Sequence, residues 1–302
     1  MNYKEFMKKF PDEKTIIDYF IKIRYPEGIR CPYCKNEKVY QKKDRLKVFD
    51  CNFCGRSFSI FKDTIFEKTT TDLQKWFFAI HLVLNAKKGI SAKQLQREIR
   101  VTYKTAWRML KQIRKAMEDK NHEGFYETIV EIDETYVGGK PGKSNKRDDD
   151  IKGGGLKRGR GTKKTPIIAV VDREAKKIFA KVALSNKKGQ KLTGRQLLDI
   201  INQVCKGKNI TVISDEFTGY NKLKGTDYIH LRIDHTKMFV DGDIHTNTIE
   251  SFWAIAKRAF YGTYHRISKK YMQEYINEIS FRYNHRNITE SFDLLLENAV
   301  IV

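Results

Sequence analysis

The chain lacks any run of apolar residues that approaches the roughly 18 needed to cross a membrane. Its first ten residues, MNYKEFMKKF, also lack the apolar segment of a secretory signal peptide. We therefore expect a soluble protein that works in the cytoplasm.

Cysteine is scarce as well, with five residues in 302, and four of these form two tight pairs. A small secreted protein held by disulfides would carry more cysteines per residue, and they would be spread more evenly along the chain. The pairing suits a reducing compartment and a bound metal ion better than a disulfide framework.

Acidic residues are in short supply relative to basic ones. The chain has 59 Lys and Arg against 37 Asp and Glu, a formal net charge of +22, and the basic residues are spread along its whole length. Such a chain is attracted to polyanions such as DNA. A lysine-rich surface that only maintains solubility is the alternative, and composition alone does not separate the two.

Hydrophobic periodicity divides the chain into three regions. Helical spacing of apolar residues dominates 71–86, 91–100 and 102–117, and period-two, strand-like runs follow Gly124. The predicted strands are 128–137, 166–172, 177–184, 210–214 and 228–233, with a helix at 193–205 and further helices after Thr246. We predict an N-terminal helix and cysteine module at 1–62, a helical region at 63–122, and an α/β domain with a mixed sheet at 123–302.

Two CxxC pairs, "CPYC" at 31–34 and "CNFC" at 51–54, are separated by 16 residues. Each pair can direct two thiolates at one ion, and two pairs complete a tetrahedral shell. Cys31, Cys34, Cys51 and Cys54 therefore predict a structural zinc ribbon, with a redox or iron–sulfur role as the alternative. Cys205 ends an apolar helical run and is expected to be a buried small residue.

The helices at 91–100 and 102–117 have the length, short turn and basic second helix of a DNA-reading helix-turn-helix. Ser91 and Thr102 are the expected N-caps. Lys104, Arg108 and Lys111 recur on one face of the second helix and are candidate DNA contacts. A structural helical hairpin with a solvated basic face is the alternative. A second candidate for DNA contact is the basic, glycine-rich segment 140–164, which has no apolar periodicity.

Carboxylates stand in unusual places in the α/β region. The strands "TIVEIDETYV" and "ITVIS" are each expected to present an acid at an end, Asp133 and Asp215, and Glu250 lies on the first turns of a helix with Lys257 two turns later. Each acid alone could cap a turn or pair at the surface. Together they can converge on a pair of magnesium ions that act on a phosphodiester.

At this point the sequence resembles the insertion-sequence transposases of the group numbered fifteen ninety-five, in which a zinc ribbon precedes a ribonuclease-H-like DDE domain. The matching blocks cover nearly the whole chain and occur in the expected order: "CPYC", "CNFCGRSFSIFKDTIFEKT", "VEIDETYVGGK", "ISDEFTGY", "HTNTIESFWAIAKRAFYGTYHRIS" and "EISFRYNHR". The resemblance implies Mg²⁺-dependent cleavage at the ends of a mobile element and strand transfer into double-stranded target DNA. It also implies a multimeric complex on DNA.

Carried over residue by residue, the resemblance makes Asp133 and Asp215 the first two catalytic acids. Either Glu250 or Asn247 supplies the third group, and we favour Glu250 because a carboxylate binds Mg²⁺ better than a neutral amide. Lys257 is expected to touch DNA phosphate near the scissile bond.

The remaining expectations concern the surroundings of these acids. Arg282 and Arg286 are candidate phosphate contacts, while Glu131, Glu134 and Glu216 are expected to support the site or lie on the surface. Crowded carboxylates also predict that, without metal, at least one has a raised pKa. The rival interpretation is a non-catalytic zinc-ribbon regulator or an inactive transposase remnant, and a nuclease on the same fold is a third.

Overall fold

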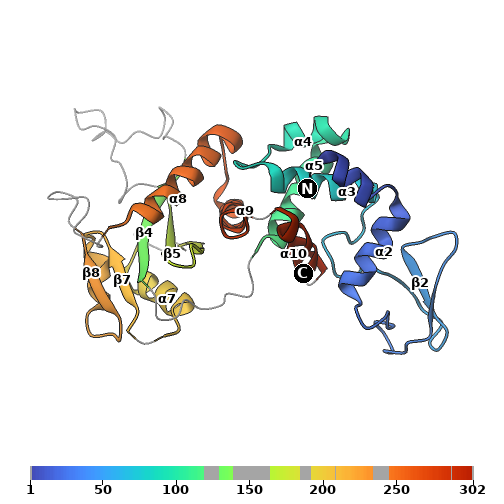
Figure 1. Cartoon of the computed structure of the whole chain (residues 1–302), viewed down its shortest axis with the longest axis horizontal. Coiled ribbons are helices and arrows are strands. Elements are labelled where there is room, and N and C mark those ends of the chain that lie inside the picture. Colours follow the sequence, from blue (N-terminus) through green and yellow to red (C-terminus); the bar gives the residue numbers. More distant parts are fainter. Residues whose placement is uncertain are drawn as a thin grey trace. The chain divides into compact units, whose positions relative to one another are not determined.

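The computed structural model describes residues 2–118, 129–138, 164–183, 192–207, 209–233, 245–286 and 288–300. The chain forms two compact units, which are described one at a time (Figure 1). The first unit comprises Met1–Glu118 together with His285–Val302, and the second comprises Asp119–Asn284.

Helices make up most of the first unit. They are α1 (Tyr3–Lys9), α2 (Glu13–Arg24), α3 (Leu73–Asn85), α4 (Ala92–Ile99), α5 (Tyr103–Ala116) and α10 (Ile288–Val300). As predicted, Ser91 and Thr102 are the N-caps of α4 and α5, and their side chains accept hydrogen bonds from the backbone N–H groups of Gln94 and Thr105. The left-handed conformation of Arg100, with φ of 51°, makes the sharp turn between these two helices.

Helix α10 packs with the N-terminal helices although more than 160 residues separate it from them. Phe292 contacts the rings of Phe10 and Phe77, and Asp293 accepts hydrogen bonds from Tyr19 and Lys9. The last segment of the predicted 123–302 domain therefore belongs to the first unit by its contacts.

The cysteine module forms a small antiparallel sheet in the first unit. Its strands are β1 (Val39–Gln41), β2 (Val48–Cys51) and β3 (Ser57–Ser59), paired in that order. Phe49 and Phe58 face each other across β2 and β3, and they are the buried aromatic residues of this sheet.

The second unit is built on a five-stranded sheet in the order β6-β5-β4-β7-β8. The strands are β4 (Ile129–Val137), β5 (Thr165–Asp172), β6 (Ile178–Val182), β7 (Thr211–Ser214) and β8 (Ile229–Arg232). The pairs β4–β5 and β5–β6 are antiparallel, whereas β4–β7 and β7–β8 are parallel. The predicted mixed sheet is confirmed, with strand ends within two residues of those expected from the sequence.

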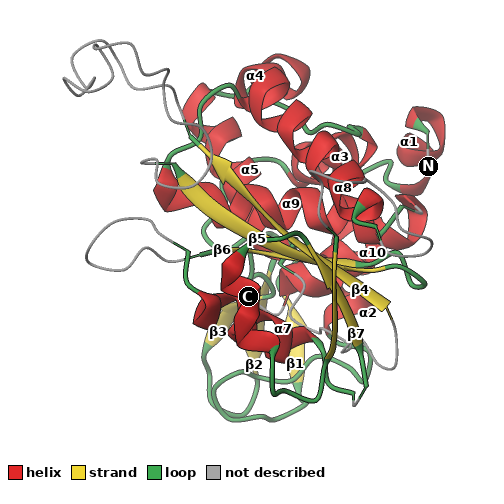
Figure 2. Cartoon of the chain, turned by 90° about the vertical axis from the view of Figure 1, so that its left-hand side faces the viewer, coloured by secondary structure: helices red, strands yellow, loops and turns green. Residues whose placement is uncertain are grey.

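Helices cover both faces of this sheet (Figure 2). Helix α7 (Gly194–Val204) packs on one face over Val130, Ile132 and Val170. Helices α8 (Asn247–Arg258) and α9 (Met272–Asn284) pack on the other, over Ile167, Ala169 and Val171. Every residue of β5 is buried as a result, which is why that strand reads as a continuous apolar run.

One detail of the sheet differs from the expectation. Asp133 lies in the middle of β4 and not at the end of a strand, because β4 continues beyond it through its antiparallel pairing with β5. Only the shorter partner, β7, ends beside it. Among the described residues, no helix is long and apolar enough to cross a membrane.

Candidate active site

The register of two parallel strands places Asp133 and Asp215 at the same level of the sheet. Glu131 of β4 pairs with Ile213 of β7, so each aspartate lies two residues further along its own chain. Side chains two residues apart on a strand share a face. The chain turns directly after Asp215, whose carboxylate accepts a hydrogen bond from the Phe217 N–H at 3.0 Å.

Helix α8 completes the group of charged side chains. Glu250 and Lys257 are both exposed, and seven residues, or about two turns, separate them on one face. A pocket of about 410 Å³ is lined by Asp133, Asp215, Thr246, Glu250, Trp253, Ala254 and Lys257. The structure therefore brings together four residues that the sequence predicted, from two strands and one helix.

Asn247 takes a different position at the start of α8. It is exposed and is not among the described residues that line the pocket. Glu250 does line it, and its Oε1 accepts a hydrogen bond from the Thr246 hydroxyl at 3.0 Å. Of the two candidates for the third group, Glu250 is therefore the one that lines the pocket.

The pKa of Asp133 is raised from 3.8 to about 8. Burial is the main cause, and the negative charges of Glu134 and Asp215 add to it, while the positive charge of Lys257 acts in the opposite direction. Neighbouring like charges and desolvation both disfavour the ionised form. The expected raised pKa of one site carboxylate is therefore found at Asp133.

Glu134 and Glu216, which follow the two aspartates, have different surroundings. Glu216 is exposed. Glu134 accepts a hydrogen bond at 3.0 Å from the phenol of Tyr220, a fully buried residue of the 3-10 helix η2 (Thr218–Leu223). Burial and the charge of Glu134 raise the pKa of Tyr220 well above its usual value, so this phenol stays a hydrogen-bond donor.

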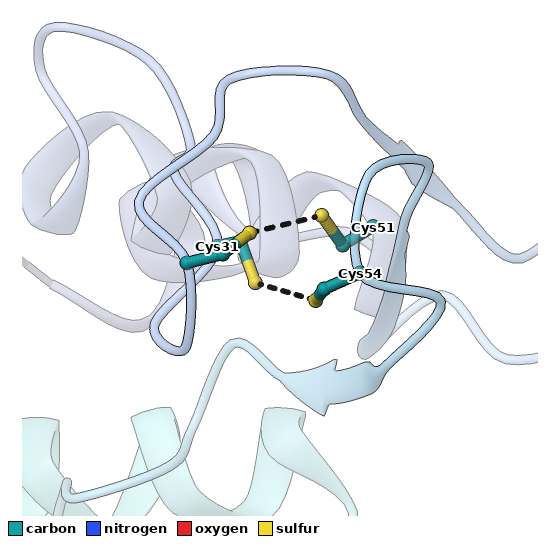
Figure 3. A group of neighbouring side chains, drawn as sticks. Cys31, Cys51 and Cys54 are labelled. Atoms are coloured by element: carbon teal, nitrogen blue, oxygen red, sulfur yellow. Dashed lines mark hydrogen bonds between the residues drawn. The ribbon is translucent and has the colours of Figure 1, made fainter.

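The four ribbon cysteines are the one group among the described residues in which three or more ligand atoms lie within 4.8 Å of one another. The Sγ atoms of Cys31 and Cys54 are 3.7 Å apart, and those of Cys34 and Cys51 are 3.5 Å apart (Figure 3). Four sulfurs bound tetrahedrally at 2.3 Å from one ion would be about 3.8 Å apart. The spacing fits a single zinc ion.

The two knuckles share the same backbone geometry. The N–H of Lys35 donates to the Cys31 carbonyl at 2.9 Å, and the N–H of Gly55 donates to the Cys51 carbonyl at 3.0 Å. Lys35 and Gly55 both have positive φ, 61° and 67°. These tight turns aim both thiolates of each knuckle at a common point.

The second helix of the hairpin shows the two faces that the sequence predicts. Ala106, Met109, Leu110 and Ile113 are buried, and Lys104 and Arg108 are exposed. Arg108 also donates to the Glu67 carbonyl at 3.1 Å. Lys111 is half-buried, with its ammonium group 5.8 Å from the centre of the Trp107 ring.

The two candidate arginines of "FRYNHR" are not equivalent. Arg282 is internal: its side chain is 9% exposed, and it pairs with Glu278, which is 1% exposed. A phosphate contact at Arg282 does not fit this arrangement, because the guanidinium already neutralises a buried carboxylate. Arg286 is exposed and belongs to the first unit. Of the basic segment 140–164, only Lys164 lies within the described residues.

Several residues of the site were not predicted from the sequence. Thr246, Trp253 and Ala254 line the pocket; Trp253 and Ala254 lie three and four residues after Glu250, so helical periodicity could have found them. Arg173 was not anticipated either: its Nε donates to Glu131 at 2.7 Å, and no local pattern marks that contact.

Two family profiles match the chain. An ISXO2-like transposase domain matches residues 124–284, and a transposase zinc-ribbon domain matches residues 11–57. The chain belongs to this transposase family. The match to the first profile covers β4 to α9, which includes the whole pocket, and gives the second unit its ribonuclease-H-like DDE fold class.

Relatives agree with this assignment. The chain is 31% identical over 289 residues to an uncharacterized protein in the transposable element ISH50 of Halobacterium salinarum, covering 91% of this chain and 92% of the relative. It is also 31% identical over 99 residues to an uncharacterized transposase-like protein of Haemophilus influenzae, covering 33% of this chain and 79% of the relative.

Among solved structures, the Mos1 strand transfer complex is similar with a TM-score of 0.31 and 13% identity, covering 74% of this chain and 78% of that one. A simian T-cell lymphotropic virus intasome gives 0.29 and 11%, covering 61% and 63%. Scores this low support no conclusion by themselves.

Proposed function

We propose that the chain is a DNA transposase of an insertion sequence, which binds the ends of its element and catalyses metal-dependent strand cleavage and strand transfer. One observation carries the proposal. Two aspartates from adjacent parallel strands and a glutamate from α8 line a single pocket together with Lys257. The origin of the long relative in a transposable element supports it.

The donor set of the pocket fits Mg²⁺. Carboxylate oxygens are its preferred protein ligands. The pKa of Asp133 is raised mainly by burial and further by the negative charges of Glu134 and Asp215, which a cation would offset. Asp133, Asp215 and Glu250 would hold the metal, with two ions as the expected number. When bound, such ions activate a water or a 3′-hydroxyl and stabilise the leaving oxygen of a phosphodiester.

The protein side chains have separate tasks in this proposal. Asp133 lies on β4, which pairs with β5 at Asp133 itself and with β7 up to Glu131, so its position is well fixed. Thr246 orients the Glu250 carboxylate through their hydrogen bond. Lys257, two turns further along the same face, contacts the phosphate of the strand in the pocket.

DNA recognition is assigned to the first unit. Cys31, Cys34, Cys51 and Cys54 bind one structural zinc ion, which leaves no open coordination site for chemistry. The exposed Lys104 and Arg108 of α5, with Lys111 beside them, contact the DNA of the element end, and Arg286 adds a further phosphate contact. Two DNA ends must be handled together, so a homo-oligomer on DNA is part of the proposal.

A transposition assay in cells tests this function. The DNA flanking the gene would bracket a selectable marker, and the wild type would be compared with Asp215→Asn. Transposition by the wild type alone is the expected result. Binding of the flanks without any transposition would favour the regulatory interpretation, and cleavage without joining would favour a nuclease.

A further inference from the structure

Directly after Lys257 and Arg258, the backbone leaves regular α-helical geometry. Residues Ala259–Tyr264 form a π-helix, η3, and it ends at His265 with φ of 55° and ψ of −49°. Both features are uncommon for ordinary residues, and both occur preferentially at functional sites. The surrounding contacts must hold this segment in place.

The inner side of the segment is anchored through Tyr264. Its phenol donates to Glu278 Oε1 at 2.6 Å, and its ring packs edge-on against Tyr275 at 4.6 Å between centroids. Glu278 is buried and also pairs with Arg282 of the same helix. This buried network fixes the π-helix to α9.

The outer side of the segment carries Tyr261, which is 55% exposed. The ring Nδ1 of His265 lies 3.0 Å from the Tyr261 carbonyl oxygen and closes the turn around it. An aromatic ring held outward on an anchored backbone loses little conformational entropy on binding, because few of its torsions remain to be fixed.

The position of Tyr261 continues the face of α8 that lines the pocket. Glu250, Ala254 and Lys257 line the pocket at helical spacing. Tyr261 follows Lys257 by four residues, which is about one turn of α-helix and slightly less than one turn of the wider π-helix that begins at Ala259, so it lies near the same face and roughly 5 Å further along. DNA rises about 3.4 Å per nucleotide of one strand. One turn of helix therefore spans one or two nucleotides from a phosphate held at Lys257.

The charge around Tyr261 is positive. Between Glu250 and Glu274 the sequence has no acidic residue, and the basic side chains there are all exposed: Lys257, Arg258, Arg266, Lys269 and Lys270. Exposed aromatic rings among cations are the combination that binds single-stranded nucleic acid, since bases stack on the ring while the cations hold the phosphates.

We propose that Tyr261 stacks on an unpaired base one or two nucleotides from the phosphate held in the pocket. The inference rests on the proposed function of that pocket. It adds that the DNA is locally unpaired beside the scissile phosphate and that Tyr261 holds the exposed base.

Equilibrium binding of the full chain to forked DNA, unpaired around the cleavage position of the element end, tests this inference. Fluorescence anisotropy without added Mg²⁺ or chelator measures affinity without cleavage and leaves the zinc of the ribbon in place. Tyr261→Ala should weaken binding by between about 5-fold and 150-fold, as expected for one lost base–ring stack. Tyr261→Phe should bind like the wild type, because the ring is kept.

An abasic scan then identifies the contacted base. In the wild type, removing the base at one position within two nucleotides of the scissile phosphate should weaken binding by the same factor. In Tyr261→Ala, removal of that base should have no effect. Tyr40→Ala, which removes an exposed ring of the ribbon, should leave the abasic response unchanged.

The outcomes that overturn the inference are distinct from failure of the proposed function. If Tyr261→Ala binds every substrate as tightly as the wild type does, stacking is refuted. It is also refuted if Tyr261→Phe loses as much affinity as Tyr261→Ala, because that result would indicate a contact through the hydroxyl group. If either occurs while the wild type cleaves the element end and Asp215→Asn does not, only this inference fails. If the wild type neither binds nor cleaves the flanks, the proposed function fails and the inference fails with it.

Discussion

Glu131 Oε2 accepts a hydrogen bond from the backbone N–H of Ile249 at 2.8 Å, across 118 residues of sequence. The fully buried carboxylate thereby caps the N-terminus of α8, whose N-cap Thr246 makes no side-chain capping bond. A negative charge is favourable at that end of a helix. Glu131 thus joins the strand that carries Asp133 to the helix that carries Glu250.

Replacing Glu131 by Gln should destabilise the second unit strongly. Glu131 Oε1 also accepts from Arg173 Nε at 2.7 Å, and Arg173 is 14% exposed. Removing one partner leaves the other as an uncompensated charge in a largely buried place, at a cost of about 3 kcal/mol or more. Urea unfolding monitored by circular dichroism measures the loss.

The matched control is Glu37→Gln. Glu37 pairs with Arg30 at 2.9 Å, but the two side chains are 72% and 53% exposed. An exposed pair contributes about 0 to 1 kcal/mol. If both variants lose the same small amount, the buried pair does not stabilise the fold in the way its geometry indicates.

The raised pKa of Asp133 predicts that, in the absence of Mg²⁺, the free energy of unfolding of the second unit depends on pH. That pKa is about 8 in the folded chain, above the ordinary 3.8, so the native state binds this proton more tightly than the unfolded state. The stabilisation is complete below about pH 4 and is lost as the pH rises to about 8. Asp133→Asn carries no such titration, so without added Mg²⁺ its stability relative to the wild type should rise by on the order of a few kcal/mol between pH 5 and 8.5.

Chemical denaturation at the two pH values, with and without Mg²⁺, measures this difference. Mg²⁺ should stabilise the wild type at pH 8.5 more than it stabilises the variant. Asp227→Asn, at an exposed aspartate of the same unit, supplies the baseline. A stability difference for Asp133→Asn that stays constant with pH would show that Asp133 titrates normally.

The sequence predicted the parts of the fold that depend on local patterns. The strands of the second unit followed from short strand-like apolar runs, and the N-caps of α4 and α5 followed from Ser91 and Thr102. The pocket residues Asp133, Asp215 and Glu250 were also predicted, because an acidic residue at an apolar strand or on the first turn of a helix can be recognised from the sequence alone.

Long-range contacts were beyond the reach of those patterns. The return of α10 to the N-terminal helices depends on Phe292 meeting Phe10 and Phe77, and periodicity shows only that α10 has an apolar face. Arg282 was predicted to contact a phosphate, which requires an accessible side chain, but it is internal. Its partner Glu278, four residues earlier, was present in the sequence, but nothing local shows that both side chains turn inward.

Zinc removal should unfold the ribbon. Its strands have three or four residues each, and its buried aromatic residues are Phe49 and Phe58, so hydrophobic burial alone is too small to hold it. We expect one zinc per chain by elemental analysis, and its loss in Cys34→Ser. Limited proteolysis should then cut within 31–54.

Cys205→Ala is the control for the zinc measurement. Cys205 is a buried residue at the C-terminal end of α7 and is not one of the four clustered thiols. This variant should keep the full zinc content. Equal zinc in Cys34→Ser and the wild type would contradict the four-cysteine site.

The basic face of α5 predicts how DNA binding depends on salt. Lys104 is exposed near the N-terminus of that helix. If it contacts a phosphate, Lys104→Ala should weaken binding to all sequences alike and reduce the slope of log affinity against log salt by about 1. Lys181→Ala, an exposed lysine on β6 that donates to Gln203, is the control.

Arg108 should behave differently from Lys104 in the same titration. Its guanidinium donates to the Glu67 carbonyl, so part of its hydrogen-bonding capacity serves the fold of the first unit, and Arg108→Ala should lower both thermal stability and DNA affinity. Arg108→Lys keeps the charge but not the planar set of donors. Arg108→Lys should therefore lose thermal stability but retain the wild-type slope of log affinity against log salt. A slope reduced as much as in Lys104→Ala would show that the phosphate contact needs the guanidinium itself and not only its charge.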